Sequence, residues 1–425
     1  MSGSLPTVVI GGGLLGAATL YELASRGEPA LLLEAKEALA TETSFANGGM
    51  LTPSMSDPWN SPGVGRHLMA SLVDPTAAMK LRLHALPDLL GWGLRFLRHS
   101  SPARHAAATE ASFRLALDST QRTRQLIRSQ GLRCDASFGG TLKLFARPRD
   151  LHGPKGIAQR LAALGLRFSV LSAAQAVERE PALAAASSRV AAALHFPDDV
   201  AADACALTRE LARLARANGA QVRTSVAAQR IVVWQGEVTG VETEGAWIAA
   251  RRVVVAGGCG SRALLRPLGL RLAVRPAKGY SLTFDVGHLS SLTPLPSLPV
   301  IDDAMHAAVT PLGRRLRAVG TAEFAGDDLS LDARRLDNLF ALLQRLYPEI
   351  ASRVDRSSGT PWAGLRPMSA DGLPFVGPAG PKGLWLNTGH GHLGLTLAMG
   401  SAALLVDQML DQPPAVSPEP FRATR

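Results

Sequence analysis

The feature that most constrains the fold is a glycine-rich turn near the amino terminus, between a short apolar strand and a helix. Thr7–Ile10 is a β-branched run, and Gly11-Gly12-Gly13-Leu14-Leu15-Gly16 follows it directly. In a G-x-G-x-x-G turn, the first glycine allows the tight bend and the second lets backbone approach a pyrophosphate. The third lets the helix pack closely on the strand. The N-terminus of that helix then presents free N–H groups to phosphates.

A second strand and an acid complete this pattern. The helix is expected to run to about Arg26 and to stop at Gly27, and Ala30–Leu33 is the next apolar strand. Glu34, at the tip of that strand, can bond ribose hydroxyls while repelling an NADP phosphate. The spacing predicts a parallel sheet with a dinucleotide site. It does not by itself separate FAD from NAD.

Bulk composition narrows the class of protein. The 425 residues exceed one ordinary core, so we expect two structural domains. No apolar run approaches the length of a membrane span, and the first strand starts too early for a signal peptide to precede it. We therefore expect a cytoplasmic protein. The net charge of +10 raises the alternative of nucleic-acid binding, but the arginines are scattered, and no nucleic-acid partner is expected.

The cysteines carry no metal or disulfide signature. Cys134, Cys205 and Cys259 lie far apart, without metal-ligand spacing or a disulfide framework. We expect no metal site, and redox chemistry must then come from a dissociable cofactor.

Periodicity and glycine stops predict the remaining elements. Residues 54–104 are rich in Pro, Gly and Trp and then turn helical. Further helices are expected within 106–131, 155–183 (with a short strand), 203–218, 329–346 and 395–410. A meander is expected over 221–226, 230–234 and 238–242, a buried strand over 252–256, and an antiparallel sheet over 273–325.

Several separated motifs along the chain give it a family resemblance. Residues 252–256 run as a strand into the paired glycines 257–258. The other motifs are residues 43–49, 57–63, 278–281, 362–367, 371–377 and 387–394. Together they resemble the D-amino-acid oxidase family, most closely its bacterial D-amino acid dehydrogenase branch.

The resemblance implies an α/β fold with two domains and non-covalent FAD in an extended pose. One is a Rossmann-like FAD-binding domain of the glutathione-reductase type, expected over residues 1–80, 195–265 and 355–425. The other is a smaller α+β substrate domain on an antiparallel sheet, expected over residues 81–194 and 266–354.

The cofactor contacts follow from the motifs and from the resemblance. The expected FAD-binding residues are Gly11, Gly13, Leu14, Gly16, Glu34, Ala35, Ser44, Asn47, Gly48, Gly49, Met50, Val226, Ala256, Gly257, Gly389, His390, Gly391, His392, Leu393 and Gly394. The last stretch leads into a helix whose N-terminal dipole can stabilise negative charge on the flavin pyrimidine. For the two histidines, the alternative is that they only cap this helix.

Arg366 is the residue expected to bind the substrate carboxylate. The resemblance places it at the position that does so in related oxidases, and a planar guanidinium grips a carboxylate with two parallel bonds. Tyr280 is the tyrosine best placed to donate to the substrate, with packing in the sheet as the alternative. His306 and Arg317 lie on expected strands and either line the pocket or face solvent. No general base is required once the amine has lost its extra proton.

The implied reaction is the FAD-dependent oxidative deamination of D-amino acids to 2-keto acids and ammonia. A hydride passes from the α carbon of a small amino-acid substrate to flavin N5, and the electrons pass on to a quinone or another carrier. Residues 81–99 mix Leu, Trp and Phe with Arg and His, as an interfacial helix does. The alternative is an amphipathic helix that covers the substrate domain, interrupted by Pro87 and Gly91. Peripheral contact with the inner membrane therefore stays open.

Other functions compatible with the motifs remain. The nearest is a glycine- or sarcosine-type enzyme, or one acting on cyclic imino acids such as D-proline or hydroxy-D-proline, as oxidase or dehydrogenase. A flavin domain that serves nucleic-acid modification is a second alternative. A flavoprotein subunit that only binds within a larger dehydrogenase is a third.

Overall fold

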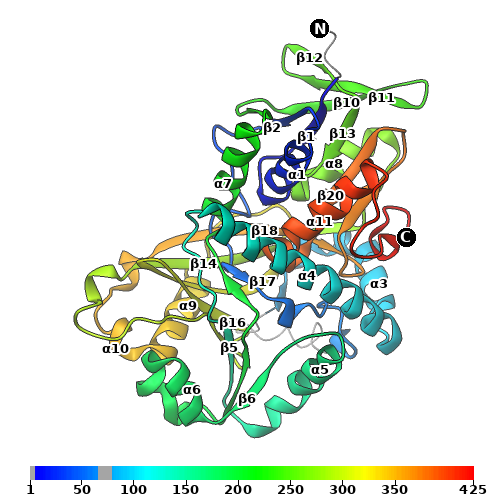
Figure 1. Cartoon of the computed structure of the whole chain (residues 1–425). Helices are drawn as coiled ribbons and strands as arrows, with labels where there is room; N and C mark the ends of the chain where they lie inside the picture. Colours follow the sequence, from blue (N-terminus) through cyan, green and yellow to red (C-terminus); the bar gives the residue numbers. More distant parts are fainter. Residues whose placement is uncertain (1–4, 66–78) are drawn as a thin grey trace.

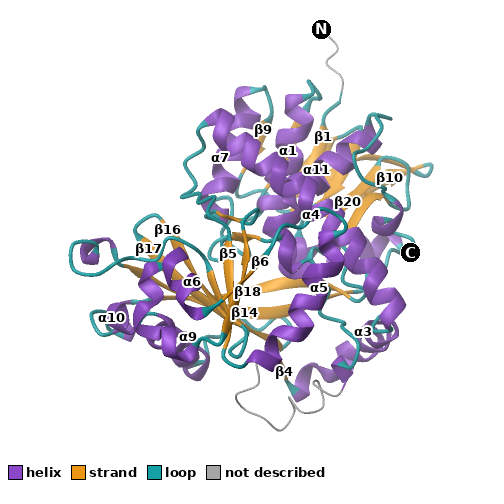
Figure 2. Ribbon diagram, turned by 60° about the horizontal axis from the view of Figure 1, so that its bottom comes forward, coloured by secondary structure: helices purple, strands orange, loops and turns teal. Residues whose placement is uncertain are grey.

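Two large sheets organise the computed structural model, which describes residues 5–65 and 79–425 (Figure 1). One is a six-stranded, mostly parallel sheet and the other is a nine-stranded, mostly antiparallel sheet. A three-stranded and a two-stranded sheet accompany them. Figure 2 shows helices packed beside the strands of both large sheets. The predicted α/β fold with a second, antiparallel sheet is confirmed.

The parallel sheet is built around the strand that enters the glycine turn. Its strand order is β19-β20-β13-β1-β2-β9. The bounds are β1 Thr7–Ile10, β2 Ala30–Leu33, β9 Gln221–Arg223, β13 Arg252–Val255, β19 Phe375–Pro378 and β20 Leu384–Thr388. Only β19 runs antiparallel to its neighbour. The central strands are largely apolar because both faces of the sheet are covered, one by helices and the other by the three-stranded sheet.

One strand differs from expectation. Residues 221–226 were predicted to open a meander, but β9 pairs in parallel with β2, from Leu31 against Gln221. The meander itself comprises only β10 Ala228–Trp234, β11 Glu237–Thr243 and β12 Ala246–Ala249. The prediction failed because a three-residue edge strand carries too little pattern to show its partner.

The second sheet has the order β18-β14-β17-β16-β15-β5-β7-β6, and β4 also pairs with β17. The bounds are β4 Met79–Leu81, β5 Thr141–Phe145, β6 Ser169–Leu171, β7 Ala192–Phe196, β14 Val274–Asp285, β15 Val300–Asp302, β16 Ala307–Leu312, β17 Arg315–Phe324 and β18 Thr360–Ser369. Two helices, α9 Ala333–Leu346 and α10 Pro348–Ala351, pack on one face of it. The small sheet pairs β3 Met50–Leu51 with β8 Val200–Ala201.

The helices begin and end close to their sequence signals. They are α1 Leu14–Ser25, α3 Leu86–Arg98, α4 Pro102–Gln130, α5 His152–Ala162, α6 Ala173–Arg179, α7 Ala204–Ala217, α8 Ser261–Leu265 and α11 Gly394–Met409. α4 ends at Gly131, which has φ +59°. The expected interruption of residues 81–99 is wrong for α3. Pro87 lies in its first turn, where a proline removes no helical hydrogen bond, and the helix continues through Gly91.

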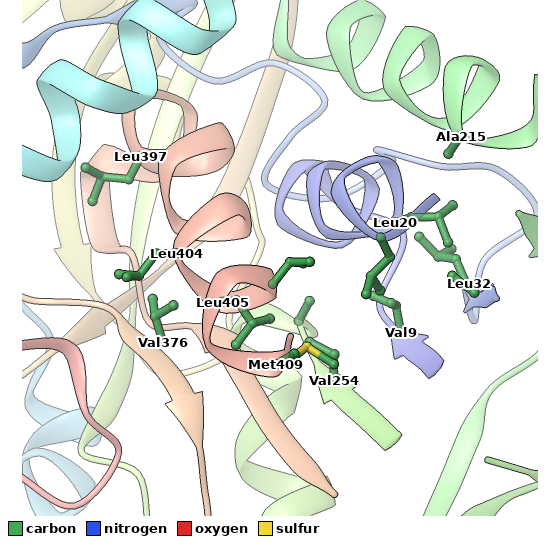
Figure 3. Packing of buried hydrophobic residues seen from close by; sticks show 14 of the residues in the cluster. Val9, Leu20, Leu32, Ala215, Val254, Val376, Leu397, Leu404, Leu405 and Met409 are labelled. Carbon is green, nitrogen blue, oxygen red and sulfur yellow. The ribbon is translucent and has the colours of Figure 1, made fainter. Parts of the chain in front are cut away.

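The main core joins α1 and α11 to the parallel sheet (Figure 3). Val9, Leu20, Val254 and Leu405 are fully buried there. Close packing of α1 on the sheet depends on Gly16, because a Cβ at that position would overlap the carbonyl oxygen of Gly11. The core thus fixes the N-terminus of α1 relative to the glycine turn.

The domain boundaries stay a prediction. Two contacts link the sheets: α4 packs against α11, and β18 packs against the single turn Gly391–Leu393 that precedes α11. Residues 1–4 and 66–78, which belong to the predicted segment 1–80, lie outside the described residues.

Candidate active site

A cavity of about 1360 Å³ is lined by residues of both large sheets. At one end lie the glycine turn after β1 and Glu34 after β2. At the other lie Arg366 of β18 and Thr321 of β17. The cavity therefore reaches from the expected nucleotide site to the expected substrate site.

The nucleotide end is shaped by backbone contacts around α1. Gly11 has φ +114°, and a Cβ there would lie 2.8 Å from the Ala256 carbonyl oxygen. The Ser44 hydroxyl accepts a hydrogen bond from the Leu14 N–H at 3.1 Å, at the helix N-terminus. The Glu34 carboxylate accepts from the backbone N–H of Gly12 at 2.5 Å, which fixes it beside the turn.

The chain at residues 47–49 is held against the cavity by the antiparallel sheet. The Thr310 hydroxyl donates to the Gly48 carbonyl at 2.7 Å, and Arg317 Nη1 donates to the Asn47 carbonyl at 3.2 Å. Arg317 also pairs with Asp203 at 3.3 Å and is buried. Arg317 thus lies behind this segment. It neither lines the cavity nor faces solvent, so both expected positions are wrong.

Two neutral histidines, of which His390 is buried and His392 half-buried, lie where the chain enters α11. Burial lowers the pKa of His390 to about 3 and the pKa of His392 to about 4. His390 Nε2 lies 3.0 Å from the Ser401 hydroxyl, and within the described structure its Nδ1 is buried without a partner. The His392 ring stacks on Trp59 with centroids 5.1 Å apart. Neither imidazole adds a positive charge to the cavity at neutral pH.

Arg366 supplies the positive charge at the substrate end. Its Nη1 donates to the Thr321 carbonyl at 3.1 Å, and its Cζ lies 5.7 Å from the Trp59 ring centroid. No carboxylate of residues 5–65 or 79–425 lies within ion-pair distance of it. Burial lowers the pKa of Arg366 to about 10, so the group remains cationic at neutral pH. This is a cation that faces a cavity without a counter-ion.

Tyr280 points away from Arg366. Arg366 pairs with Ala277 in the register of β14 and β18, and paired residues project from the same side of a sheet. Tyr280 lies three residues after Ala277, so the side chains of Tyr280 and Arg366 project from opposite sides. The Tyr280 hydroxyl donates to the fully buried Glu323 at 2.9 Å. The structure brings Tyr280 to the cavity wall but not to the guanidinium, and its role with substrate stays a prediction.

Sequence comparison places the chain among known proteins. A model of the family described as FAD dependent oxidoreductase (DAO) matches residues 7–408. The D-amino acid dehydrogenase of Paramagnetospirillum magneticum is 36% identical over 414 residues, which cover 97% of each chain. That of Cereibacter sphaeroides is 37% identical over 409 residues, covering 96% of this chain and 92% of its own. The chain belongs to the DAO family of FAD-dependent oxidoreductases.

Two solved structures share the fold. Glycine oxidase from Geobacillus kaustophilus superposes with a TM-score of 0.75 at 23% identity, covering 99% of this chain and 98% of its own. L-proline dehydrogenase from P. horikoshii has a TM-score of 0.77 at 17% identity and covers 100% of this chain and 98% of its own. At these identities the likeness is one of fold.

The residues present fit FAD, the cofactor of this family. Gly13 and Gly257 leave room for a pyrophosphate beside the N-terminus of α1, because an added Cβ would meet no atom closer than 3.4 Å at either position. The N-cap residue of α1 is Gly13, which has no side chain to occupy this space. At the other end, α11 begins without an acidic residue in its first turn. The buried His390 Nδ1, which lacks a partner within the described structure, is a polar atom that a flavin edge can satisfy. The chain is therefore an FAD-dependent enzyme.

Nearly all expected site residues line the cavity. The exceptions are Gly16, which packs beneath Gly11, and Gly389, which has φ +79° beside Phe375. His306 lines the cavity from the exposed turn between β15 and β16, where its φ is +46°, so its expected place on a strand is wrong. The individual roles of these residues stay predictions.

Two cavity residues near Arg366 were not predicted. Trp59 lies within the family-like motif 57–63. Its contact with Arg366 could not be predicted because the two residues are far apart in the sequence. Thr321 gave no sequence signal, because nothing in its neighbours indicates that its φ is +62°.

A buried carboxyl braces the loop that leads to Trp59. Asp199 is fully buried and accepts hydrogen bonds from the hydroxyl and backbone N–H of Ser54, at 2.6 and 3.4 Å. Burial raises the pKa of Asp199 to about 7 from an ordinary value of 3.8. The folded state therefore holds the proton more tightly than the unfolded state does. Its contribution to stability is fully present below about pH 4 and is lost as the pH rises through 7.

We expect Asp199→Asn, which stays neutral, to melt at a higher temperature than the wild type at pH 8 and at a similar temperature at pH 5. Thermal unfolding at both pH values measures this difference. The exposed Glu244→Gln variant is the control and should follow the wild type at both. Identical pH profiles for Asp199→Asn and wild type would remove Asp199 from this role.

Proposed function

We propose that this protein catalyses the oxidative deamination of D-amino acids to 2-keto acids and ammonia, with electrons passed to a quinone or another carrier. The observation that carries the proposal is the Arg366 guanidinium, which faces the cavity without a carboxylate partner in the described part of the chain. A desolvated charge is costly unless it is paired. A substrate carboxylate is the partner that this position fits.

The groups around Arg366 allow it to orient a substrate carboxylate as well as attract it. The Nη1 bond to the Thr321 carbonyl holds one edge of the guanidinium, and its remaining N–H groups can bind a carboxylate with two parallel bonds. Because His390 and His392 are neutral, neither competes for that anion. Arg366 then decides which way the substrate α carbon faces.

Bound FAD supplies a hydride acceptor for the substrate C–H bond. The protein's part is to hold the carboxylate at Arg366, so that the α carbon stays at a fixed distance and angle. The imine product hydrolyses in water to a keto acid and ammonia. Support for D-amino acids comes from the relatives at 36–37% identity, which are named D-amino acid dehydrogenases.

We expect anaerobic mixing of the yellow, FAD-loaded protein with a panel of amino acids to bleach the flavin absorbance with D-amino acids. Arg366→Ala should raise the concentration needed at least a hundredfold, about 2.7 kcal/mol at 1.36 kcal/mol per tenfold. The loss follows from removing the cation that binds the carboxylate.

The exposed arginine Arg314 offers a matched control, because its side chain is 76% accessible. Arg314→Ala should stay within twofold of wild type. A change of only two- or threefold for Arg366→Ala would reject its role. Bleaching by glycine, L-amino acids or cyclic imino acids alone would reject the D-amino acid assignment.

We further propose that α3 brings the enzyme to the membrane surface where its acceptor lies. No helix within residues 5–65 and 79–425 is long and apolar enough to cross a membrane. The inner face of α3 buries Leu89, Trp92 and Phe96 against the antiparallel sheet. Its outer face exposes Leu90 and Leu94, at 67% and 71% of their surface. Arg95 and Arg98 flank them in the last turn. Exposed leucines beside arginines suit an anionic lipid surface.

Replacing Leu90 and Leu94 together by Gln should weaken sedimentation with anionic phospholipid vesicles at least tenfold, because the apolar area that inserts is lost. Reduction of a soluble dye acceptor should be unchanged. Leu292→Gln, a 59% exposed leucine on another part of the surface, should bind vesicles as the wild type does. Equal vesicle binding by all three proteins would contradict the proposed contact.

A further inference from the structure

The guanidinium of Arg366 occupies the space where the neighbouring strand has no side chain. In the register of β14 and β18, Ala277 faces Arg366 and Gly279 faces Gly364, so all four residues share one face of the sheet. A Cβ built on Gly279 would overlap Cζ, Nη1 and Nη2 of Arg366. Similar overlap with all three atoms indicates that the flat face of the guanidinium lies over the Gly279 backbone.

The glycine is required by space and not by backbone conformation. Gly279 does not lie in the left-handed region, so the backbone accepts any residue there. The three heavy atoms nearest to an added Cβ all belong to the end of one flexible side chain, Arg366. An alanine would therefore fit the strand and displace the guanidinium.

The third strand of the group, β17, bulges at the same level. Lys278 pairs with Glu323 and Tyr280 with Gly320, so the two residues Thr321 and Ala322 lie opposite the single residue Gly279. Thr321 has φ +62°, a conformation that a β-branched residue adopts only under constraint. Its carbonyl accepts the Arg366 Nη1 hydrogen bond at 3.1 Å.

We propose that Gly279 and the bulged Thr321 form a seat that fixes the Arg366 guanidinium, which makes Gly279 a positioning residue for the substrate carboxylate. The Gly279 backbone supports the face of the group and the Thr321 carbonyl holds one edge. The free N–H groups are thereby directed at the cavity. This inference rests on the proposed carboxylate-binding role of Arg366.

The test is Gly279→Ala in the FAD-loaded protein, with propionate as an unreactive carboxylate. Its Kd is measured from the perturbation of the flavin absorbance, beside the KM and kcat of the preferred D-amino acid. We expect the propionate Kd and the KM to rise at least tenfold, since an ångström of misplacement spoils a bidentate contact. FAD content and melting temperature should stay near wild type. A Kd within twofold of wild type would overturn the seat.

A matched glycine separates this effect from crowding in the sheet. A Cβ on Gly359, just before β18, would lie 2.7 Å from side-chain atoms of Leu282 and Phe284 and touch nothing of Arg366. Gly359→Ala should lower the melting temperature and leave the propionate Kd unchanged. A tenfold weakening there would also overturn the seat.

The double variant Gly279→Ala with Arg366→Ala tells the two proposals apart. Without a guanidinium to displace, the alanine should add less than a twofold effect. If Arg366→Ala alone leaves propionate binding unchanged, the proposed function fails. If Arg366→Ala weakens binding and Gly279→Ala does not, only the seat fails.

If Gly279→Ala fails to fold, the same double variant shows whether the clash with Arg366 is the cause. If its yield and FAD content recover when Arg366 is also removed, the clash was with the guanidinium, as the seat requires. If they do not recover, another contact requires the glycine and the seat is rejected.

Discussion

Within the described part of the chain, the Arg366 guanidinium has one hydrogen bond, and no carboxylate lies within ion-pair distance of it. The rest of the substrate end depends on this arrangement. A desolvated cation without a counter-ion is tolerated only where neighbouring structure holds it and where a ligand can pair with it. The two histidines beside the cavity are neutral. The incoming carboxylate therefore pairs with Arg366 alone, and this single ion pair also orients the substrate.

The two sheets cooperate in placing that ligand relative to the cofactor. The parallel sheet carries the turn and the N-terminus of α1 that suit a pyrophosphate. The antiparallel sheet carries Arg366, and its Thr310 and Arg317 also hold the backbone at Gly48 and Asn47. One rigid sheet thus contacts both the substrate site and the segment expected at the flavin. Such coupling lets the α carbon and its acceptor keep a fixed separation without a flexible linker between them.

Local rules predicted the parts of the fold that local sequence determines. The glycine turn, the end of α4 at Gly131 and the strand before Gly257 all rest on residues next to one another in the chain. Contacts between residues far apart in the sequence were harder to predict. Contrary to expectation, β9 pairs within the parallel sheet and Arg317 lies behind the cavity wall. The bulge at Thr321 could not be predicted, because its positive φ is imposed by neighbouring strands. Arg366 itself was predictable through family resemblance. The contact with Gly279 was not, because it depends on the pairing of two strands far apart in the sequence.

The most direct test of the account compares a substrate with its own carboxamide, which keeps the amine and the α carbon but loses the negative charge. The D-amino acid that reduces the flavin fastest and its amide would be mixed anaerobically with wild type and with Arg366→Ala. The account predicts that wild type prefers the acid at least a hundredfold per unit concentration, and that the variant loses this preference. Equal reduction of acid and amide by wild type would contradict it.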